Sequence, residues 1–433
     1  MYQSPHRHKS ILAQRNDGRT GSGIPMRVLI AHNAYQQPGG EDTVLNTERD
    51  LLIGAGNEVF EYLRHNSEIT SESIGSNIAL GIRTVWSSGS RNELYRLLQS
   101  CKPDVVHFHN TFPLISPAAY YACRDLGIPV VQTLHNYRLF CPAAAFFRDG
   151  KVCEDCLEKS RWQAVRHACY RQSRSASAAV AAMLSFHHWY GTWTNLVNCY
   201  IALSEFSRAK FIEAGLPSEK VRVKPNFVLR DSGVDGGPRE GAVFLGRLSE
   251  EKGLRTLIQA WTRVNRNCSL RVIGDGPLLN EMRSEISRSG LSHVRLDGRL
   301  SREESLTVLR GAKVLIHPSN CYENFPMAIA EAYACGTPVI ASRLGAMQEI
   351  VHDGRTGLHF TAGDADDLAK KVEWAWAHPD EMRTMGRNAR AEYDAKYTAE
   401  RNYNLLLAIY EQVIQEAREP LASDARRACH VAD

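Results

Sequence analysis

The feature that most constrains the fold is a strand–helix alternation that runs, stops at a polar linker and starts again. The first series begins with the apolar run 27–31 and the second with 242–245, each of which predicts a short buried strand. Residues 229–240 between them are polar and rich in Gly and Pro, which is typical of a link between domains. The alternation predicts two α/β domains, each with a parallel sheet covered by helices on both faces.

Length supports two domains, because the chain has 433 residues and single cores rarely grow beyond roughly 250–300 residues. The expected organisation is a disordered extension over 1–25, an N-terminal domain over 26–228, the linker over 229–240, a C-terminal domain over 241–397, a helix over 398–417 that packs back on the N-terminal domain, and a tail over 418–433.

Composition favours a cytoplasmic protein. The eleven cysteines are an odd number in a large chain, which argues for a reducing compartment. The polar start has no apolar stretch typical of a secretory signal, and no run approaches the roughly 18 residues of a membrane span. The net charge of +4 is too weak to suggest nucleic acid. A basic cluster is either a solvated helix face or a patch toward anionic lipid headgroups or a pyrophosphate-linked acceptor. It comprises Arg161, Arg166, Arg171 and Arg174.

The most informative segment runs from 318 to 342, where seven residues separate Glu323 from Glu331. We expect a buried helix over 326–335, with Asn324 as its cap and Glu331 on it. A buried carboxylate needs hydrogen bonds, and ribose hydroxyls would supply them. The free amides of Phe325, Met327 and Ala328 would suit a diphosphate.

This segment resembles the signature of family 4 (group 1) retaining glycosyltransferases, and the resemblance extends from Gly39 to about Tyr410. It implies a GT-B fold, in which two Rossmann-like domains face each other across a cleft. It also implies that Glu323 contacts the donor sugar and that Glu331 binds the ribose of a nucleotide-sugar donor.

Residues 245–253 resemble the family's strand-to-loop segment, in which an arginine and a lysine clamp the diphosphate. The matching residues are Arg247 and Lys252, after a strand that ends at Gly246. Fixed cations can stabilise a departing diphosphate, so we expect catalysis to require no metal cofactor.

Loops of the N-terminal domain supply further candidates. The pair Gly39 and Gly40 lets the backbone approach a phosphate or sugar, although an ordinary turn has the same pattern. His135 follows the expected strand 129–134, and the resemblance implies contact with the donor sugar near the reacting carbon. His107 and His109 end another strand and are weaker candidates, for packing or acceptor contacts.

Two loops of the C-terminal domain are expected to surround the nucleotide base. Gly274 follows the strand 270–273, and Arg299 and Leu300 follow the strand 294–296. The resemblance implies backbone contacts, and ordinary turns would have the same pattern.

A cysteine-rich insert over 141–169 forms a separate constellation. Eleven residues separate Cys141 from Cys153, two separate Cys153 from Cys156, and twelve separate Cys156 from Cys169. Four thiols can hold a structural zinc ion, with His167 as a replacement ligand, or remain reduced; disulfides fit a reducing compartment least. Because the insert follows His135, we expect it to shape the acceptor pocket.

Together these patterns predict a retaining glycosyltransferase that acts on a glycan or lipid-linked acceptor in cell-surface polysaccharide biosynthesis, with peripheral contact to the inner face of the cytoplasmic membrane. The alternatives are a nucleotide-sugar epimerase or phosphorylase on the same fold, and a catalytically inactive nucleotide-sugar-binding subunit.

Overall fold

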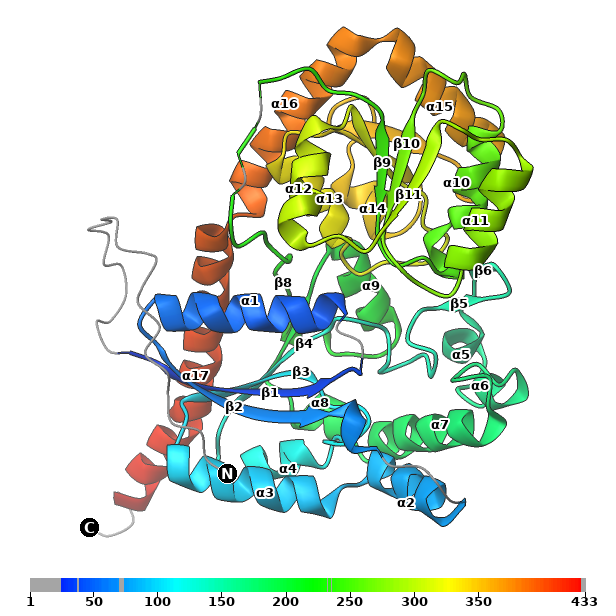
Figure 1. The fold of residues 1–433 in the computed structure, drawn as a ribbon. Coiled ribbons are helices and arrows are strands. Elements are labelled where there is room, and N and C mark those ends of the chain that lie inside the picture. The colour runs from blue at the N-terminus through cyan, green and yellow to red at the C-terminus, as the bar shows by residue number, and fades with distance from the viewer. Residues whose placement is uncertain (1–24, 37–38, 70–73, 232, 235, 430–433) are drawn as a thin grey trace.

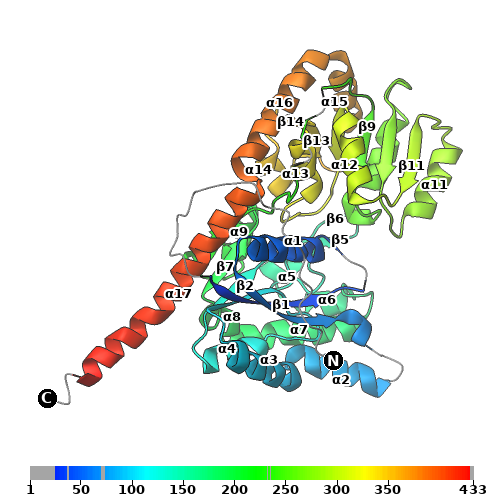
Figure 2. The ribbon, with the colours of Figure 1, turned by 60° about the vertical axis from the view of Figure 1, so that its left-hand side comes forward.

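The structure is a computed structural model that describes residues 25–36, 39–69, 74–231, 233–234 and 236–429 (Figure 1). The extension predicted to be disordered lies, except for its last residue, outside the described residues. Two α/β units stand one above the other, and the C-terminal helix runs down the side of the lower unit (Figures 1 and 2).

The N-terminal sheet has six parallel strands in the order β2-β1-β3-β4-β7-β8. The inner strands β1, β3, β4 and β7 are covered by helices on both faces, which explains their short, buried runs in the sequence, whereas the edge strand β2 is largely exposed. The strands are β1 (Arg27–Ala34), β2 (Glu58–His65), β3 (Val105–Asn110), β4 (Val130–Thr133), β7 (Cys199–Ala202) and β8 (Val221–Val223). The helices are α1 (Gly40–Gly54), α2 (Ile74–Val85), α3 (Ser88–Cys101), α4 (Ala119–Asp125), α7 (Arg174–Trp189), α8 (Thr192–Asn195) and α9 (Glu205–Glu213).

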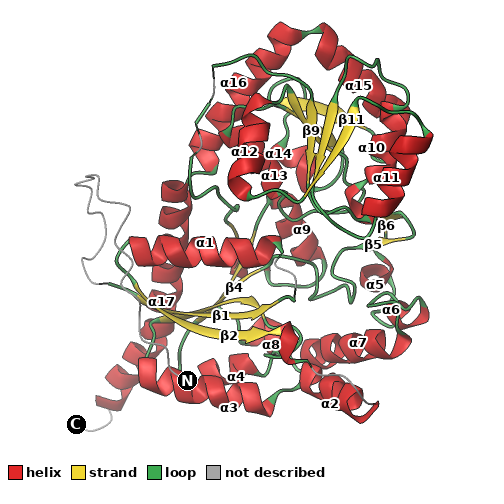
Figure 3. Cartoon of the chain, in the orientation of Figure 1, coloured by secondary structure: helices red, strands yellow, loops and turns green. Residues whose placement is uncertain are grey.

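The C-terminal sheet also has six parallel strands, in the order β11-β10-β9-β12-β13-β14 (Figure 3). The strands are β9 (Ala242–Leu245), β10 (Leu270–Ile273), β11 (Val294–Gly298), β12 (Val314–His317), β13 (Val339–Ser342) and β14 (Gly357–Phe360). The helices are α10 (Leu254–Trp261), α11 (Leu279–Arg288), α12 (Arg302–Gly311), α13 (Met327–Ala334), α14 (Ala346–Ile350) and α15 (Ala365–Ala377).

Each strand order reverses direction once, between β1 and β3 in the first sheet and between β9 and β12 in the second. In open parallel sheets, ligands bind beyond the carboxyl ends of the strands at this switch point. The loops after β1, β3, β9 and β12 are therefore where a site is expected.

The chain crosses between the domains twice, and the two crossings are joined to each other. The Val228 amide donates to the Tyr397 carbonyl at 3.1 Å, and Val228 forms a parallel bridge with Thr398. One apolar cluster continues through this region from Val28 in β1 to Leu315 in β12. The hinge side of the molecule is thus a shared apolar core.

Two long helices complete the molecule: α16 (Pro379–Lys396) and α17 (Ala399–Cys429). α17 packs on the N-terminal domain, where the Tyr410 hydroxyl lies 2.7 Å from His107 Nδ1. It continues to Cys429, so most of the tail predicted over 418–433 is helical. The strand β14 and the helices α14 and α16 are additional to the elements expected from the sequence.

The cysteine-rich insert contains only short elements: β5 (Phe147–Arg148), β6 (Lys151–Val152), α5 (Asp155–Glu158) and α6 (Gln163–Arg166). The sequence predicts a largely helical segment over 161–191, but left-handed backbone at Ala168, Arg171 and Gln172 separates α6 from α7. Among the described residues, no helix has the length and apolar content that crossing a bilayer requires.

Candidate functional site

Glycines let the loops at the carboxyl ends of β9 and β10 stack directly on one another. The Gly246 amide donates to the Ile273 carbonyl at 3.1 Å. At Gly274, φ is +146° and an added Cβ would lie 1.8 Å from the Gly246 carbonyl oxygen. The strand-end packing therefore requires glycine at 274, and a ligand contact is an additional prediction for both positions.

Lys252 and Glu323 meet at the switch point of the C-terminal sheet. Lys252 Nζ lies 2.8 Å from Glu323 Oε1, and the two side chains are 24% and 10% exposed. Gly253 sets this approach, because its φ is +71° and an added Cβ would lie 1.8 Å from the Pro318 carbonyl oxygen. The loops after β9 and β12 thus bring together two residues singled out in the sequence.

His317, the last residue of β12, is a third member of this cluster that sequence reasoning missed. Its Nε2 lies 2.9 Å from Glu323 Oε1. Burial raises the pKa of Glu323, but Lys252 and His317 outweigh it and hold that pKa well below its ordinary value. Burial lowers the pKa of Lys252, and Glu323 more than compensates. Glu323 is therefore a carboxylate and Lys252 an ammonium at neutral pH. In the sequence, His317 could have been found as a histidine at the carboxyl end of a predicted strand.

Glu331 lies on α13 and differs from Glu323 in its electrostatic setting. Burial raises the pKa of Glu331, and Arg302, whose Nε lies 3.6 Å from Glu331 Oε1, lowers it only in part. A weakly compensated carboxylate suits a hydroxyl donor such as ribose. Met327 and Ala328 occupy the first turn of α13, where amides have no intrahelical acceptor.

The predicted cap by Asn324 is wrong. Pro326 is the N-cap of α13, without a side-chain cap hydrogen bond. Asn324 Nδ2 instead donates to the Leu134 carbonyl in the N-terminal domain, at 3.2 Å. This hydrogen bond crosses the domain junction and joins the loop after β4 to the loop after β12.

The crossing brings His135 close to the Glu323 loop, since Leu134 and Asn324 are their respective chain neighbours. Tyr137 follows on the same loop, where burial raises its pKa and the charge of Glu323 acts in the same direction. The two loops that the sequence placed on opposite sides of a site are therefore adjacent.

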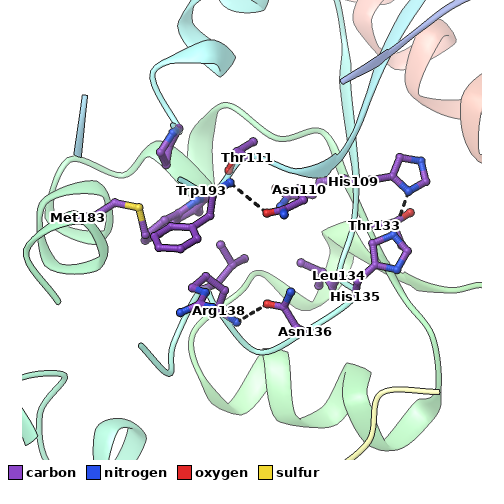
Figure 4. Close-up of a pocket in the computed structure, with 14 residues that line it drawn as sticks. His109, Asn110, Thr111, Thr133, Leu134, His135, Asn136, Arg138, Met183 and Trp193 are labelled. Carbon is purple, nitrogen blue, oxygen red and sulfur yellow. Dashed lines mark hydrogen bonds between the residues drawn. The ribbon is translucent and has the colours of Figure 1, made fainter. Parts of the chain in front are cut away.

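His135 packs against His109 (Figure 4). His135 Nε2 lies 2.9 Å from His109 Nδ1, and the rings stack at 5.1 Å. His109 Nε2 faces Glu48 Oε1 at 3.4 Å, which favours a proton on that nitrogen. His109 Nδ1 then accepts from His135, leaving His135 Nδ1 with its lone pair. Burial lowers the pKa of both histidines, that of His109 to about 3.

Glu48 holds a buried ion pair with Lys224, with Nζ and Oε2 2.8 Å apart and both side chains 1% exposed. Glu48, His107 and His109 also form a group with metal-ligand atoms within 4.8 Å of one another among the described residues. The Lys224 ammonium already supplies the positive charge there, so we assign the group a structural role. In the sequence, Glu48 could have been found as a glutamate on the apolar face of a helix, four residues after Val44.

The first turn of α1, which follows β1, contributes Glu41 as a further candidate. Asn136 Nδ2 lies 3.1 Å from Glu41 Oε2, and Asn110 Nδ2 lies 3.2 Å from Glu41 Oε1. Burial raises the pKa of Glu41. Gly39 is the N-cap of α1 with φ −107°, and a Cβ added at Gly40 would meet nothing within 4 Å. Open space at Gly40 leaves room for a ligand.

The remaining candidates lie on the C-terminal side. Arg247 and Arg299 are exposed in the loops after β9 and β11. Leu300 and Met327 are partly buried against the shared core, and Phe325 is buried beside Tyr397. The structure thus keeps Arg247 available to a ligand, while the side chain of Phe325 packs in the hinge.

The four cysteines of the insert are free thiols: Cys141 is buried, and Cys153, Cys156 and Cys169 are partly buried. Burial raises the pKa of Cys156 to about 12 and also raises the pKa of Cys169.

In comparisons with known proteins, two different families match the two halves of the chain. The glycosyl transferases group 1 family matches residues 231–392, and glycosyltransferase family 4 matches residues 78–231. An α-maltose-1-phosphate synthase of Mycolicibacterium smegmatis is 31% identical over 330 residues, 71% of this chain and 79% of that protein. A glycosyltransferase of Methanocaldococcus jannaschii is 32% identical over 171 residues, 40% of this chain and 48% of its own length.

Solved structures show the same architecture. Sucrose-phosphate synthase from Thermosynechococcus elongatus superposes with a TM-score of 0.66 at 19% identity, covering 90% of this chain and 100% of that one. HepE of Anabaena, in complex with UDP and glucose, gives 0.61 at 18% identity, covering 92% of this chain and 100% of its own. The two facing parallel-sheet domains have the GT-B architecture that these structures share. Within that class, the chain belongs to the group 1, family 4 glycosyltransferases.

Proposed function

We propose that the enzyme transfers a sugar from a nucleotide-sugar donor with retention of the anomeric configuration. The observation that carries this is the Lys252–Glu323 pair, 2.8 Å apart, held beside the His135 loop by the Asn324–Leu134 hydrogen bond. A cation, a carboxylate and a neutral histidine thus lie on loops that this hydrogen bond joins across the domain junction. Glu323 would hold the donor sugar, and His135 would contact it from the opposite domain.

The donor would place its diphosphate against Lys252, Arg247 and the first turn of α13. Bond breaking between the anomeric carbon and the phosphate oxygen leaves negative charge on the diphosphate, and fixed cations and amides stabilise that charge. The new bond forms to an acceptor oxygen, whose proton is released to the diphosphate or to water. Glu331 would accept hydrogen bonds from the ribose. The bound UDP and glucose in the HepE structure support this class of donor.

Product analysis tests the proposal. Incubation with UDP-, GDP- or ADP-sugars and a glycan acceptor should yield a glycoside with the anomeric configuration of the donor, assigned by NMR. Inversion of configuration would contradict retention. Incubation with donor alone should leave the sugar's stereochemistry unchanged, and its conversion to an epimer would identify the epimerase alternative.

We further propose a lipid-linked acceptor at a membrane surface, in polysaccharide biosynthesis. The end of α7 exposes Phe186, Trp189 and Tyr190, with Trp189 79% exposed. α2 packs beside α7 at the same edge of the N-terminal domain and exposes Ile78 and Ile82 (Figure 1). A groove of about 570 Å³ lies between the two helices, with Arg171 in its lining. Exposed aromatic and basic side chains together suit an anionic lipid surface.

Co-sedimentation with vesicles containing anionic phospholipid tests this contact. Trp189→Ser should reduce the bound fraction severalfold, whereas Ile53→Ser, which alters another exposed apolar side chain, on α1, should not. Equal binding by wild type and the Trp189→Ser variant would rule out α7 as the contact.

A further inference from the structure

Two cavities of the N-terminal domain share a wall. His135 and Arg138 line the cavity beyond the end of β4 (Figure 4), whereas the groove of about 570 Å³ lies between α2 and α7. Phe112, in the loop after β3, lines both. The α2–α7 groove therefore ends beside the cavity that holds His135.

Apolar side chains line most of the α2–α7 groove, among them Ile78 of α2 and Val180 of α7. The two helices approach closely at Gly81, where an added Cβ would lie 3.6 Å from the Cβ of Ala179. The volume of the groove falls within the roughly 300–1,000 Å³ typical of sites for small molecules. Its lining suits a hydrocarbon chain.

The shared wall carries two arginines on one tyrosine ring. The guanidinium carbons of Arg138 and Arg171 lie 5.0 and 5.5 Å from the centroid of the Tyr170 ring. Arg138 also lies over the ring of Phe112, at 4.5 Å. An arginine stacked on an aromatic face keeps N–H donors at the edge of its plane, where they can bind an anion.

The surrounding backbone holds both arginines in place. Arg138 Nη1 donates to the Pro142 carbonyl. Arg171 has a φ of +54°, a left-handed conformation that residues other than glycine rarely adopt. The Tyr170 amide donates to Ser177 Oγ of α7 at 2.9 Å, which ties the ring's own residue to that helix. The arrangement of two cations around one ring is therefore a property of the fold.

The positive charge of these arginines is not neutralised by the protein. Arg148, in the hairpin between them, forms an ion pair with Asp155 at 2.7 Å. In contrast, neither Arg138 nor Arg171 has a carboxylate partner within the residues that the structure describes. Two fixed cations without a counter-charge favour an anion beside the Tyr170 ring, and phosphate oxygens match the donors of a guanidinium group.

Hydroxyl groups lie next to Arg171 in the lining of the groove. Ser173 and Ser175 contribute them, with their Oγ atoms 3.1 Å apart. Both lie at the start of the 16-residue helix α7, whose dipole adds positive potential to that of the arginines.

We propose that Arg138 and Arg171 bind a phosphate group of the acceptor, and that the acceptor is a phosphorylated lipid whose chain lies in the α2–α7 groove. The inference rests on the lipid-linked acceptor proposed above and adds the chemistry of its link. Along the wall, the polar cavity of His135 is followed by the two arginines and then by the apolar groove. This order matches sugar, phosphate and chain.

Calorimetric titration of the full-length protein tests the site with three probes: farnesyl diphosphate, farnesol and inorganic pyrophosphate. Saturating UDP is present throughout, so that the proposed diphosphate site at Lys252 is occupied. We expect farnesyl diphosphate to bind at least about tenfold more tightly than either other probe. Equal affinity for pyrophosphate, equal affinity for farnesol, or no binding of farnesyl diphosphate would overturn the proposal.

Variants assign the phosphate contact. Arg171→Gln should weaken farnesyl diphosphate binding about tenfold, the scale of one hydrogen bond to a charged group. Arg96→Gln changes an exposed arginine of α3 that does not line the groove, and should bind as wild type does. Arg138→Gln is a second variant, compared with wild type by circular dichroism and melting temperature. Unchanged affinity in both Arg171→Gln and Arg138→Gln would contradict the assignment.

Two further comparisons separate this inference from the proposals on which it rests. Sugar transfer with retention, measured by product analysis, would stand even if farnesyl diphosphate did not bind, and only the phosphorylated-lipid acceptor would then be withdrawn. If Arg171→Gln lost vesicle binding but kept its affinity for farnesyl diphosphate, the arginine would contact bilayer headgroups and the phosphate assignment would be wrong.

Discussion

At the scale of single residues, Glu323 and Glu331 show how similar side chains acquire different roles. Glu323 is fixed as a carboxylate by Lys252 and His317, whereas the ion-pair partner of Glu331 in the described part of the chain is Arg302, at 3.6 Å. The first arrangement keeps a fixed negative charge on Glu323, the residue proposed to hold the donor sugar. The second leaves an acceptor with unused hydrogen-bonding capacity, which a hydroxyl group can satisfy.

Replacing Lys252 should mainly slow transfer. We expect Lys252→Met to lower kcat/KM by roughly 10²- to 10³-fold, the usual loss when one fixed group that stabilises transition-state charge is removed. Steady-state kinetics with a saturating acceptor measure the effect. Lys370→Met changes an exposed lysine of α15 and should leave the rate unchanged. An unaltered rate in the Lys252 variant would remove the phosphate clamp from the mechanism.

Stability should fall on acidification because His109 is buried in its neutral form. Its pKa is about 3 in the folded protein, below the ordinary 6.5. Between these pH values the unfolded chain binds a proton at this histidine that the folded chain does not bind. The contribution of His109 to the free energy of unfolding is therefore complete above pH 6.5 and declines as the pH falls toward 3. The slope is at most about 1.4 kcal/mol per pH unit.

Urea denaturation at a series of pH values between about 7.5 and 5 measures this slope. His109→Asn keeps a polar atom near His135 but cannot take up the proton, so its stability should depend less on pH. An equal slope in both proteins would show that other groups cause the acid sensitivity.

At the scale of elements, the strand-end loops were largely predictable and their partners were not. Lys252 and Glu323 each follow a recognisable buried strand, and β9 and β12 are neighbours in the sheet. Asn324 was misassigned because its acceptor, Leu134, lies 190 residues away. The break between α6 and α7 uses Ala168, Arg171 and Gln172, none of them glycine, so local sequence gives no sign of it.

The start of α1 offers a test of ligand approach at an element terminus. Gly40→Ala should fold normally, because an added Cβ meets nothing within 4 Å and alanine favours helix. If the donor approaches this backbone, the methyl group should raise the donor KM about tenfold, equivalent to 1.4 kcal/mol. Gly89→Ala in α3 meets equally open space and is the control. Equal KM values would place the donor away from Gly40.

At the scale of the whole molecule, a polar contact joins the domains next to the apolar core that they share, since Ala346, Met347 and Ile350 of α14 belong to that core. The Glu349 carboxylate of α14 accepts hydrogen bonds from the amides of Glu205 and Phe206, at 3.0 and 2.8 Å. These amides begin α9 in the N-terminal domain, where the helix dipole favours negative charge. One side chain thus caps a helix of the other domain only while the domains stay together.

Removing this cap should favour separated domains. We expect Glu349→Ala to increase the radius of gyration in small-angle X-ray scattering without donor, and donor should reverse the increase. Glu373→Ala changes an exposed glutamate on α15 and should have no such effect. Scattering profiles that are identical for wild type and the Glu349→Ala variant would show that the cap does not govern domain separation.

The paired crossings at Val228 and Thr398 determine which motion is available when that cap releases. A single connecting strand would let one lobe both swing and twist relative to the other. Two connections bonded side by side resist twisting, because rotation about the long axis of the molecule would shear their shared bridge. The donor and acceptor loops should therefore separate and return along one path, with the same relative orientation at each turnover.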